Sequence, residues 1–198
     1  MEAFNHSLFL LLNAPAHPNA VLLAVARLFA DDLIWLAPLI LVAGWLCGSE
    51  PTRRRVLEAA IAGCAGLLLN QAIAMAWPQP RPFMIGLGHT LIAHAADSSF
   101  PSDHLTLMWT VAFSLAMHRA SRPVGTLLAW LGLPMAWARI YLGVHFPLDI
   151  AGALAVAVLS AWLCFSEGGW FMEPVFRGVS AVYRRLFAMP IRRGWMRE

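Results

Sequence analysis

The chain has 198 residues and a formal net charge of +3, with 60% of its residues hydrophobic and only 13% charged. Soluble domains carry about 25% charged residues, so this composition excludes an ordinary water-soluble domain. Three cysteines, and 14 glycines without a period, also exclude disulfide-rich and collagen-like proteins. We therefore expect an all-α integral membrane protein, folded as a single domain over residues 1–198.

Residues 3–30 contain two short apolar stretches, 4–12 and 21–30, separated by a segment that contains two prolines. Each stretch is shorter than the roughly 17 residues that a spanning helix needs. The extreme N-terminus carries Glu2 and has no arginine before Arg27, which is not typical of a secretory signal peptide. We expect two interfacial or half-inserted helices here, with a sixth membrane crossing as the alternative.

Five later stretches are apolar enough to cross a bilayer, for which a helix needs about 20 residues. The third is the weakest candidate, because only 13 uncharged residues lie between His104 and His118. It reaches about 27 Å only if its helix begins at Pro101. The five predicted spans are 31–48, 56–77, 101–118, 123–143 and 147–166.

The placement of arginine predicts the topology, because short cytoplasmic loops are rich in basic residues. All 14 basic residues are arginine, and only Arg27, Arg81 and Arg139 fall on or near the external side. With five crossings, the N-terminus then lies outside and the C-terminus inside. The cytoplasmic arginines are Arg53, Arg54, Arg55, Arg119, Arg122, Arg177, Arg184, Arg185, Arg192, Arg193 and Arg197.

The tail over residues 171–189 mixes Phe, Val and Leu with arginine. This pattern is typical of a basic amphipathic helix that lies on the anionic cytoplasmic leaflet. A solvated tail that only sets the topology is the alternative.

A first polar cluster lies in and after the external loop 78–100. It contains Arg81, and it ends at a helix start marked by Pro101 and the hydroxyl of Ser102, shortly before His104. The free N–H groups of a helix start favour an anion. A capped helix start without a ligand explains the same residues.

A second polar cluster runs from Arg139 to Asp149, where Pro147 opens the fifth predicted span. His145 and Asp149 are four residues apart, so the carboxylate can reach back to the imidazole. Such a carboxylate holds one ring nitrogen protonated and leaves the other free as a nucleophile or base. Taken alone, a His/Asp pair at a helix start is more often structural.

The predicted hairpin of spans three and four brings both clusters to the same external face. Two guanidiniums and a helix N-terminus then match a tetrahedral oxyanion such as phosphate. His145, backed by Asp149, can attack phosphorus, and His104 can protonate the leaving oxygen. No ligand spacing for a metal is present, so we expect side chains to supply the positive charge, with no metal and no cofactor.

These ordered motifs resemble those of the type 2 phosphatidic acid phosphatase family, which shares its site with the vanadium haloperoxidases. The family pattern is Lys-x6-Arg-Pro, Pro-Ser-Gly-His and Ser-Arg-x5-His-x3-Asp. The matching residues are Arg81-Pro82, Pro101-Ser102-Asp103-His104 and Arg139-x5-His145-x3-Asp149.

The chain departs from the family pattern at three positions: the lysine falls at Ala74, the glycine is Asp103, and the serine before Arg139 is Ala138. An ionised Asp103 that faced a phosphate would repel it, so we expect this carboxylate to pair with an arginine. The run 94–100, followed by Asp103, resembles bacterial undecaprenyl-diphosphatases linked to bacitracin resistance. That subgroup also lacks the lysine.

The resemblance implies a metal-independent membrane phosphatase that forms a phosphohistidine intermediate on His145. Asp149 would stabilise the imidazolium, and His104 would act as general acid and then as general base. The phosphate-binding group would consist of Arg81, Ser102, Asp103 and Arg139, with the helix N–H groups.

The resemblance also implies the reaction: undecaprenyl diphosphate is hydrolysed to undecaprenyl phosphate and inorganic phosphate at the outer face of the bacterial cytoplasmic membrane. This would recycle the lipid carrier for peptidoglycan synthesis and support bacitracin resistance. The expected partners are the polyprenyl lipid and membrane lipids, with no nucleic acid. The alternatives are a phosphatase for phosphatidylglycerophosphate, phosphatidic acid or lipid A and, from a different class, a small transporter or channel.

Two interpretations remain open for several polar residues near these motifs. Asn70 and Gln71 either orient Arg81 or are structural, and with Glu58 they are the polar residues in mid-span that a transporter would use. We expect His89 and His94 to be solvated loop residues rather than substrate contacts.

Overall fold

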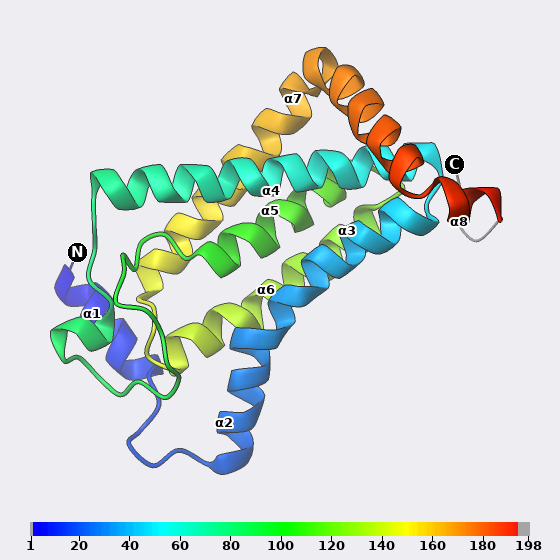
Figure 1. Ribbon diagram of the computed structural model, residues 1–198. Coiled ribbons are helices and arrows are strands. Elements are labelled where there is room, and N and C mark those ends of the chain that lie inside the picture. Colours follow the sequence, from blue (N-terminus) through cyan, green and yellow to red (C-terminus); the bar gives the residue numbers. More distant parts are fainter. Residues whose placement is uncertain (1, 194–198) are drawn as a thin grey trace.

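The computed structural model describes residues 2–193, and every regular element in that range is a helix (Figure 1). The all-α expectation is therefore confirmed for the described part of the chain. Arg197, counted above among the cytoplasmic arginines, lies outside the described residues. The elements are α1 (Glu2–Leu12), α2 (Ala20–Arg27), η1 (Leu28–Asp32), η2 (Leu33–Trp35), α3 (Leu36–Cys47), α4 (Glu50–Ala76), η3 (Pro82–Ile85), α5 (Asp103–Met117), α6 (Arg122–Tyr141), α7 (Pro147–Leu186) and α8 (Ala188–Arg192).

The helix α2 runs into α3 without a non-helical break. Asn19 caps its start, because its side-chain oxygen accepts the N–H groups of Val21 (2.9 Å) and Leu22 (3.2 Å). A π turn (η1) and a 3-10 turn (η2) then join α2 to α3, and the ribbon bends there (Figure 1). The expectation of a separate short helix over 21–30 is wrong, because this segment is the first part of the helical run that contains the first predicted span.

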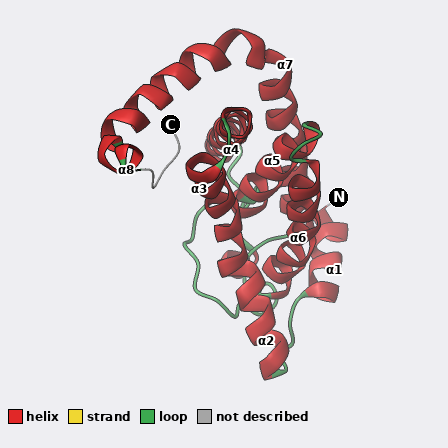
Figure 2. Cartoon of the chain, turned by 90° about the vertical axis from the view of Figure 1, so that its right-hand side faces the viewer, coloured by secondary structure: helices red, strands yellow, loops and turns green. Residues whose placement is uncertain are grey.

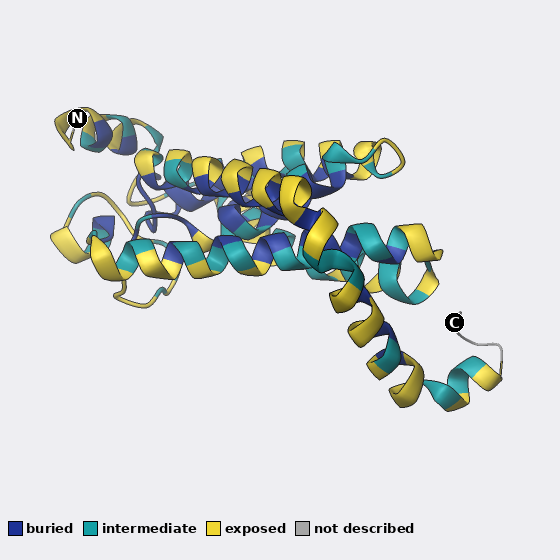
Figure 3. Cartoon of the chain, turned by 90° about the horizontal axis from the view of Figure 1, so that it is seen from above, coloured by how far each residue is buried: buried dark blue, intermediate teal, exposed yellow. Residues whose placement is uncertain are grey.

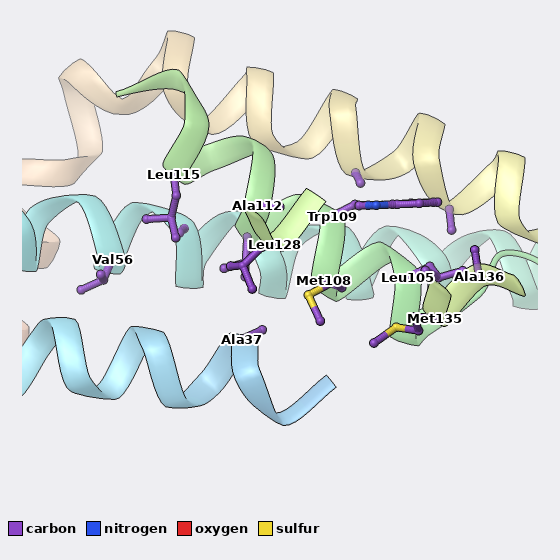
Figure 4. Close-up of a cluster of buried hydrophobic side chains, with 14 residues drawn as sticks. Ala37, Val56, Leu105, Met108, Trp109, Ala112, Leu115, Leu128, Met135 and Ala136 are labelled. Atoms are coloured by element: carbon purple, nitrogen blue, oxygen red, sulfur yellow. The ribbon is translucent and has the colours of Figure 1, made fainter. Parts of the chain in front are cut away.

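Helix α5 lies at the centre of the bundle and contacts α4, α6 and α7. Its buried side chains are on several faces, and they form one core with residues of the surrounding helices (Figure 4). At 15 residues it is about 22 Å long, which is short for a bilayer. The short third span is thus enclosed by longer helices. The core residues are Ala37, Val56, Ala59, Leu105, Met108, Trp109, Val111, Ala112, Leu115, Leu128, Met135, Ala136, Ala153 and Ala157.

Helix α7 is longer than the predicted fifth span and continues to Leu186. It bends in the part drawn orange in Figure 1, and the bend is also visible in Figure 2. The second half of the helix carries Gly168, Gly169 and Pro174. Proline removes a hydrogen bond from a helix and clashes with the preceding turn, which explains a bend of this kind. The predicted tail helix over 171–189 is therefore mostly the second arm of α7, not a separate element.

The second arm of α7 packs against the corner between α3 and α4. Arg54 forms an ion pair with Glu173 (2.7 Å), and its guanidinium lies 4.1 Å from the ring centroid of Phe176. Trp45 contacts the rings of both Phe176 and Tyr183. These contacts exclude the alternative of a freely solvated tail for this part of the chain.

The outward faces of the long helices carry many exposed apolar side chains, whereas the buried residues face the interior of the bundle (Figure 3). The exposed set includes Trp130 (67%) and Leu68 (71%), which a water-soluble protein would not leave bare on this scale. Helices α4 and α7 are long and apolar enough to cross a membrane. The protein is therefore a helical membrane protein.

Helix α1 lies against the segment that leads into α7. Phe9 is fully buried and its ring centroid lies 5.3 Å from that of Phe146. The side-chain amide of Asn13, just after α1, donates to the carbonyl oxygens of Tyr141 (3.0 Å) and His89 (2.9 Å). The N-terminal helix thus connects the two loops that carry the polar clusters.

Candidate active site

The two polar clusters meet at the imidazole of His145. Nη1 of Arg81, at the start of η3, lies 3.2 Å from His145 Nε2. Oγ of Ser102 also lies 3.2 Å from this nitrogen. Ser102 is the N-cap residue of α5, yet its hydroxyl makes no capping bond to that helix. Stretches more than 40 residues apart in the sequence are therefore brought together, as the sequence analysis predicts.

His145 is backed by the carboxylate of Asp149, in the first turn of α7. Nδ1 of the imidazole lies 3.2 Å from Asp149 Oδ2. The same oxygen accepts the N–H of Phe146 (2.7 Å) and a short hydrogen bond from the hydroxyl of Ser99. Three donors thus hold one carboxylate oxygen in place behind the imidazole.

The hydrogen bonds of His145 determine which of its nitrogens is free. Arginine can only donate, so the bond from Arg81 requires an unprotonated Nε2. The proton is then on Nδ1 and is donated to Asp149. Burial lowers the pKa of His145 well below its usual value, and the charges of Arg139 and Arg81 lower it further. The imidazole is therefore neutral, with the Nε2 lone pair facing the two phosphate-binding candidates.

The loop before His145 depends on a glycine. Gly143 has a φ of +83°, a backbone conformation that residues with a side chain rarely adopt. A Cβ at this position would lie 2.1 Å from the carbonyl oxygen of His89. Glycine here lets the chain turn sharply out of α6 and present the imidazole to α5.

Arg81 is fixed by the loop that precedes α5. Its Nε and Nη2 each lie 2.8 Å from one carboxylate oxygen of Asp97, and its Nη1 donates to the carbonyl oxygen of Val144 (2.9 Å). Partial burial alone would raise the pKa of the Asp97 carboxyl. The hydrogen bond from Arg81 and its positive charge together have the larger effect, so the pKa is lowered. The ion pair places a guanidinium beside His145 before any substrate binds.

Arg139, near the end of α6, is almost fully buried (1% exposed). Its Nη1 donates to the carbonyl oxygen of Ala30 (3.1 Å), in the π turn, and lies 4.0 Å from Asp31. Its Nη2 lies 3.0 Å from His94 Nε2. Within residues 2–193, no partner exists for its Nε. A buried donor without a partner is available to a ligand oxygen.

His104 lies in the first turn of α5. Its imidazole interacts electrostatically with those of His145 and His94 and with the guanidiniums of Arg139 and Arg81. Its ring nitrogens make no hydrogen bond to the described residues. Both nitrogens are therefore free for proton transfer to a bound group.

The expectation that Asp103 pairs with an arginine is wrong. Its carboxylate accepts hydrogen bonds from the side-chain amides of Asn70 (2.8 Å) and Gln71 (3.4 Å), both on α4. The amide of Asn70 also reaches Thr106 (3.0 Å). The two amides thus orient Asp103 rather than Arg81, and the carboxylate is directed toward α4 rather than into a phosphate-binding set.

The two other departures from the family pattern lie in different surroundings. Ala74 lines a small cavity of about 50 Å³ together with Gln71, Asp97 and Asp103, and no basic residue lines it. Ala138 is fully buried and packs with Ala30 and other apolar residues. No cation stands at the position of the family lysine, and the position of the family serine belongs to the apolar core.

The expectation that His94 is a solvated loop residue is wrong, because it packs beside His145. Its side chain is only 19% exposed, and its ring packs edge-on against that of His145, with centroids 6.2 Å apart. His89, in contrast, is exposed, as expected. The only sequence signal for His94 is its place at the start of the polar run that ends at Phe100.

The chain belongs to the PAP2 superfamily, whose family model matches residues 55–172. It is 38% identical to a protein of Escherichia coli (strain K12) named putative undecaprenyl-diphosphatase YbjG, over 100% of both chains. It is also 38% identical to undecaprenyl-diphosphatase BcrC of Bacillus subtilis (strain 168), over 94% of this chain and 97% of that protein. The resemblance on which the sequence analysis relies is thereby confirmed.

Two solved structures share the fold at 21% sequence identity. The crystal structure of Aquifex aeolicus LpxE has a TM-score of 0.64 and covers 82% of this chain and 95% of its own. That of a PAP2 type phosphatidylglycerolphosphate phosphatase from Bacillus subtilis has a TM-score of 0.60 and covers 86% of this chain and 88% of its own. The chain therefore shares the fold of a PAP2 type phosphatase.

Proposed function

We propose that this protein hydrolyses undecaprenyl diphosphate to undecaprenyl phosphate and inorganic phosphate. One observation carries the chemistry: His145 presents an unprotonated Nε2 to Arg81 and Ser102, with Asp149 behind its other nitrogen. The choice of lipid follows the two relatives named undecaprenyl-diphosphatase, which match nearly the whole chain.

In the first step, His145 Nε2 attacks the terminal phosphorus, and the bond from this phosphorus to the bridging oxygen breaks. His104 gives its proton to that oxygen, so undecaprenyl phosphate leaves. The imidazolium of the phosphohistidine keeps its proton on Nδ1, where Asp149 stabilises it.

Binding of the phosphate exchanges existing hydrogen bonds for new ones. In the free protein, Arg81 and Ser102 both reach Nε2, and they donate to phosphate oxygens once a phosphorus atom lies against that nitrogen. The unpaired Nε–H of Arg139 supplies a further donor. These groups are fixed in advance and act most strongly as charge redistributes in the transition state.

In the second step, His104, which has lost its proton, takes one from water. The resulting nucleophile attacks the phosphohistidine, the bond to Nε2 breaks, and inorganic phosphate leaves. His145 returns to its neutral form with the proton on Nδ1. Each turnover therefore consumes one water molecule. It begins with His145 neutral and His104 protonated.

The proposed location is the bacterial cytoplasmic membrane, with five crossings and the active site on the external side. The five crossings are the run α2–α3 and the helices α4, α5, α6 and α7. Arg81, Ser102 and His145 lie at the ends of helices on one side of the bundle, whereas Arg54 and Arg122 lie in or beside the loops at the other. This separation supports an internal C-terminus.

A substrate comparison tests the proposal. Purified protein in detergent is given undecaprenyl diphosphate, phosphatidylglycerophosphate, phosphatidic acid or lipid A, and phosphate release is measured. We expect the highest kcat/KM with undecaprenyl diphosphate. A higher kcat/KM with a glycerolipid or lipid A would contradict the substrate while leaving the site chemistry intact. Absence of hydrolysis of every lipid, with a folded protein, would favour a transporter.

A further inference from the structure

The guanidinium of Arg139 is held from two sides in the free protein. The carbonyl oxygen of Ala30 accepts from Nη1 (3.1 Å), and His94 Nε2 lies 3.0 Å from Nη2. The carbonyl of Ala30 belongs to the π turn, where the helical hydrogen-bond pattern is shifted. Both terminal nitrogens thus have an acceptor, while Nε, among the described residues, has none.

We propose that His94 is a positioning residue: its unprotonated Nε2, with the carbonyl oxygen of Ala30, holds the Arg139 guanidinium so that Nε–H is presented to the substrate phosphate. This inference rests on the proposed function, in which Arg139 binds phosphate. The side chain of His94 does not itself bind the phosphate in this arrangement, because its Nε2 lone pair is occupied by Arg139.

The role requires neutral His94. Arginine cannot accept a hydrogen bond, so Nε2 of His94 must be the acceptor and Nδ1 must carry the proton. Nδ1 lies 3.2 Å from the carbonyl oxygen of Ala95, which is a suitable acceptor for that proton. Protonation of Nε2 would place two donors and two positive charges against each other, and Arg139 would lose one of its two supports.

The charged groups around His94 favour the neutral form. Partial burial lowers its pKa, and the charges of Arg81 and Arg139 lower it further, which together outweigh the opposite effect of the hydrogen bond with Ala95. Asp97, on the same loop, has the opposite effect, but it is 4.0 Å from His94 Nδ1 and is already paired with Arg81. His145, from the loop before α7, and His104, from α5, are the other titratable groups that face it.

The test compares His94→Ala and His94→Gln with the wild type. Glutamine offers an oxygen near the position of Nε2 but has no proton to gain. We expect His94→Ala to lower kcat/KM about tenfold, the effect of losing one hydrogen bond to a charged group. His94→Gln should restore most of this loss at neutral pH. As the pH falls, the wild-type KM should rise because protonated His94 no longer accepts from Arg139, whereas the KM of His94→Gln should stay constant. His89→Ala, an exposed histidine of the same loop, is the matched control and should behave as the wild type.

The assay uses whichever lipid phosphate the wild type hydrolyses best, so a wrong substrate does not affect the outcome. Wild-type kcat/KM in His94→Ala would overturn the proposal. The proposal would also be overturned if kcat/KM of His94→Gln were as low as that of His94→Ala, because a hydrogen-bond acceptor at this position would then not restore activity. A KM that rises with falling pH in His94→Gln as steeply as in the wild type would overturn the requirement for a neutral imidazole at position 94. The glutamine variant keeps the test valid even if the alanine variant does not fold.

Discussion

Asn5 in α1 caps the helix that carries Asp149: its side-chain oxygen accepts the backbone N–H of Leu148 at 3.1 Å. Leu148 follows Pro147, which has no N–H, so Asn5 satisfies the first free donor of α7. The cap comes from an element more than 140 residues away and lies next to Asp149, the carboxylate behind His145. The N-terminal helix is therefore part of the support of the site.

Replacement of Asn5 by leucine leaves this partly buried donor without its partner, and we expect it to lower the free energy of unfolding by about 1 kcal/mol. It should also lower kcat several-fold with little change in KM, because Asp149 and His145 lose their exact alignment rather than their contact with the lipid. Ser7→Ala, on the exposed side of α1, is the control and should change neither quantity. Thermal unfolding and steady-state kinetics in detergent measure both effects.

Asp149→Asn should lower kcat by about 10³-fold or more, with KM nearly unchanged. The amide cannot stabilise an imidazolium as a carboxylate does, and it can hold the wrong tautomer of His145. Ser99→Ala removes only one of three donors to Asp149 and should cost about tenfold or less. Equal losses in the two variants would show that the carboxylate acts through folding rather than catalysis.

The dependence of kcat/KM on pH should be bell-shaped. His145 must be neutral to attack, and burial lowers its pKa, so activity should persist below the ordinary imidazole pKa of about 6.5 before it declines with falling pH. His104 must carry a proton to release the lipid phosphate, so activity should also decline on the alkaline side. Rates measured between about pH 4 and pH 9 test both limbs, and a monotonic profile would contradict the paired roles.

Phosphate release should persist in EDTA. In the proposed mechanism, Arg81, Arg139 and the N–H groups at the start of α5 supply the positive charge that the transferred phosphate needs. The rate in EDTA should lie within about twofold of the rate in a buffer with added Mg²⁺. Complete loss on chelation, restored by Mg²⁺, would show that the reaction needs a metal ion.

The sequence was sufficient to predict the convergence of the two clusters. Pro101 and Pro147 mark the helix starts, and the spacing of His145 and Asp149 places both on one face of a helix end. The hairpin of α5 and α6 then brings Arg139 back to the same side. These are local signals, so they do not depend on how the helices pack.

The direction of Asp103 and the role of His94 depend on tertiary structure. Asp103 could face either the site or α4, and the choice depends on the rotation of α5 against Asn70. His94 acquires its role only through Arg139, which is 45 residues away in the sequence. No local sequence pattern predicts a contact between two residues so far apart in the chain.

The helix ends were missed for a different reason. The apolar pattern predicts that one span begins at residue 31 and another ends at residue 166. Hydrogen bonding continues across both places, through a π turn before α3 and through the bend of α7. Hydropathy reports where lipid contact ends, whereas helices can continue beyond it.

The most direct test of the account is the rate of phosphate release from undecaprenyl diphosphate by His145→Ala, measured beside the wild type. Without the Nε2 nucleophile, we expect the rate to fall by at least about 10⁴-fold while the variant remains folded in the membrane. A rate within about tenfold of the wild type would contradict His145 as the nucleophile, and with it the central claim that the two polar clusters form one phosphatase site.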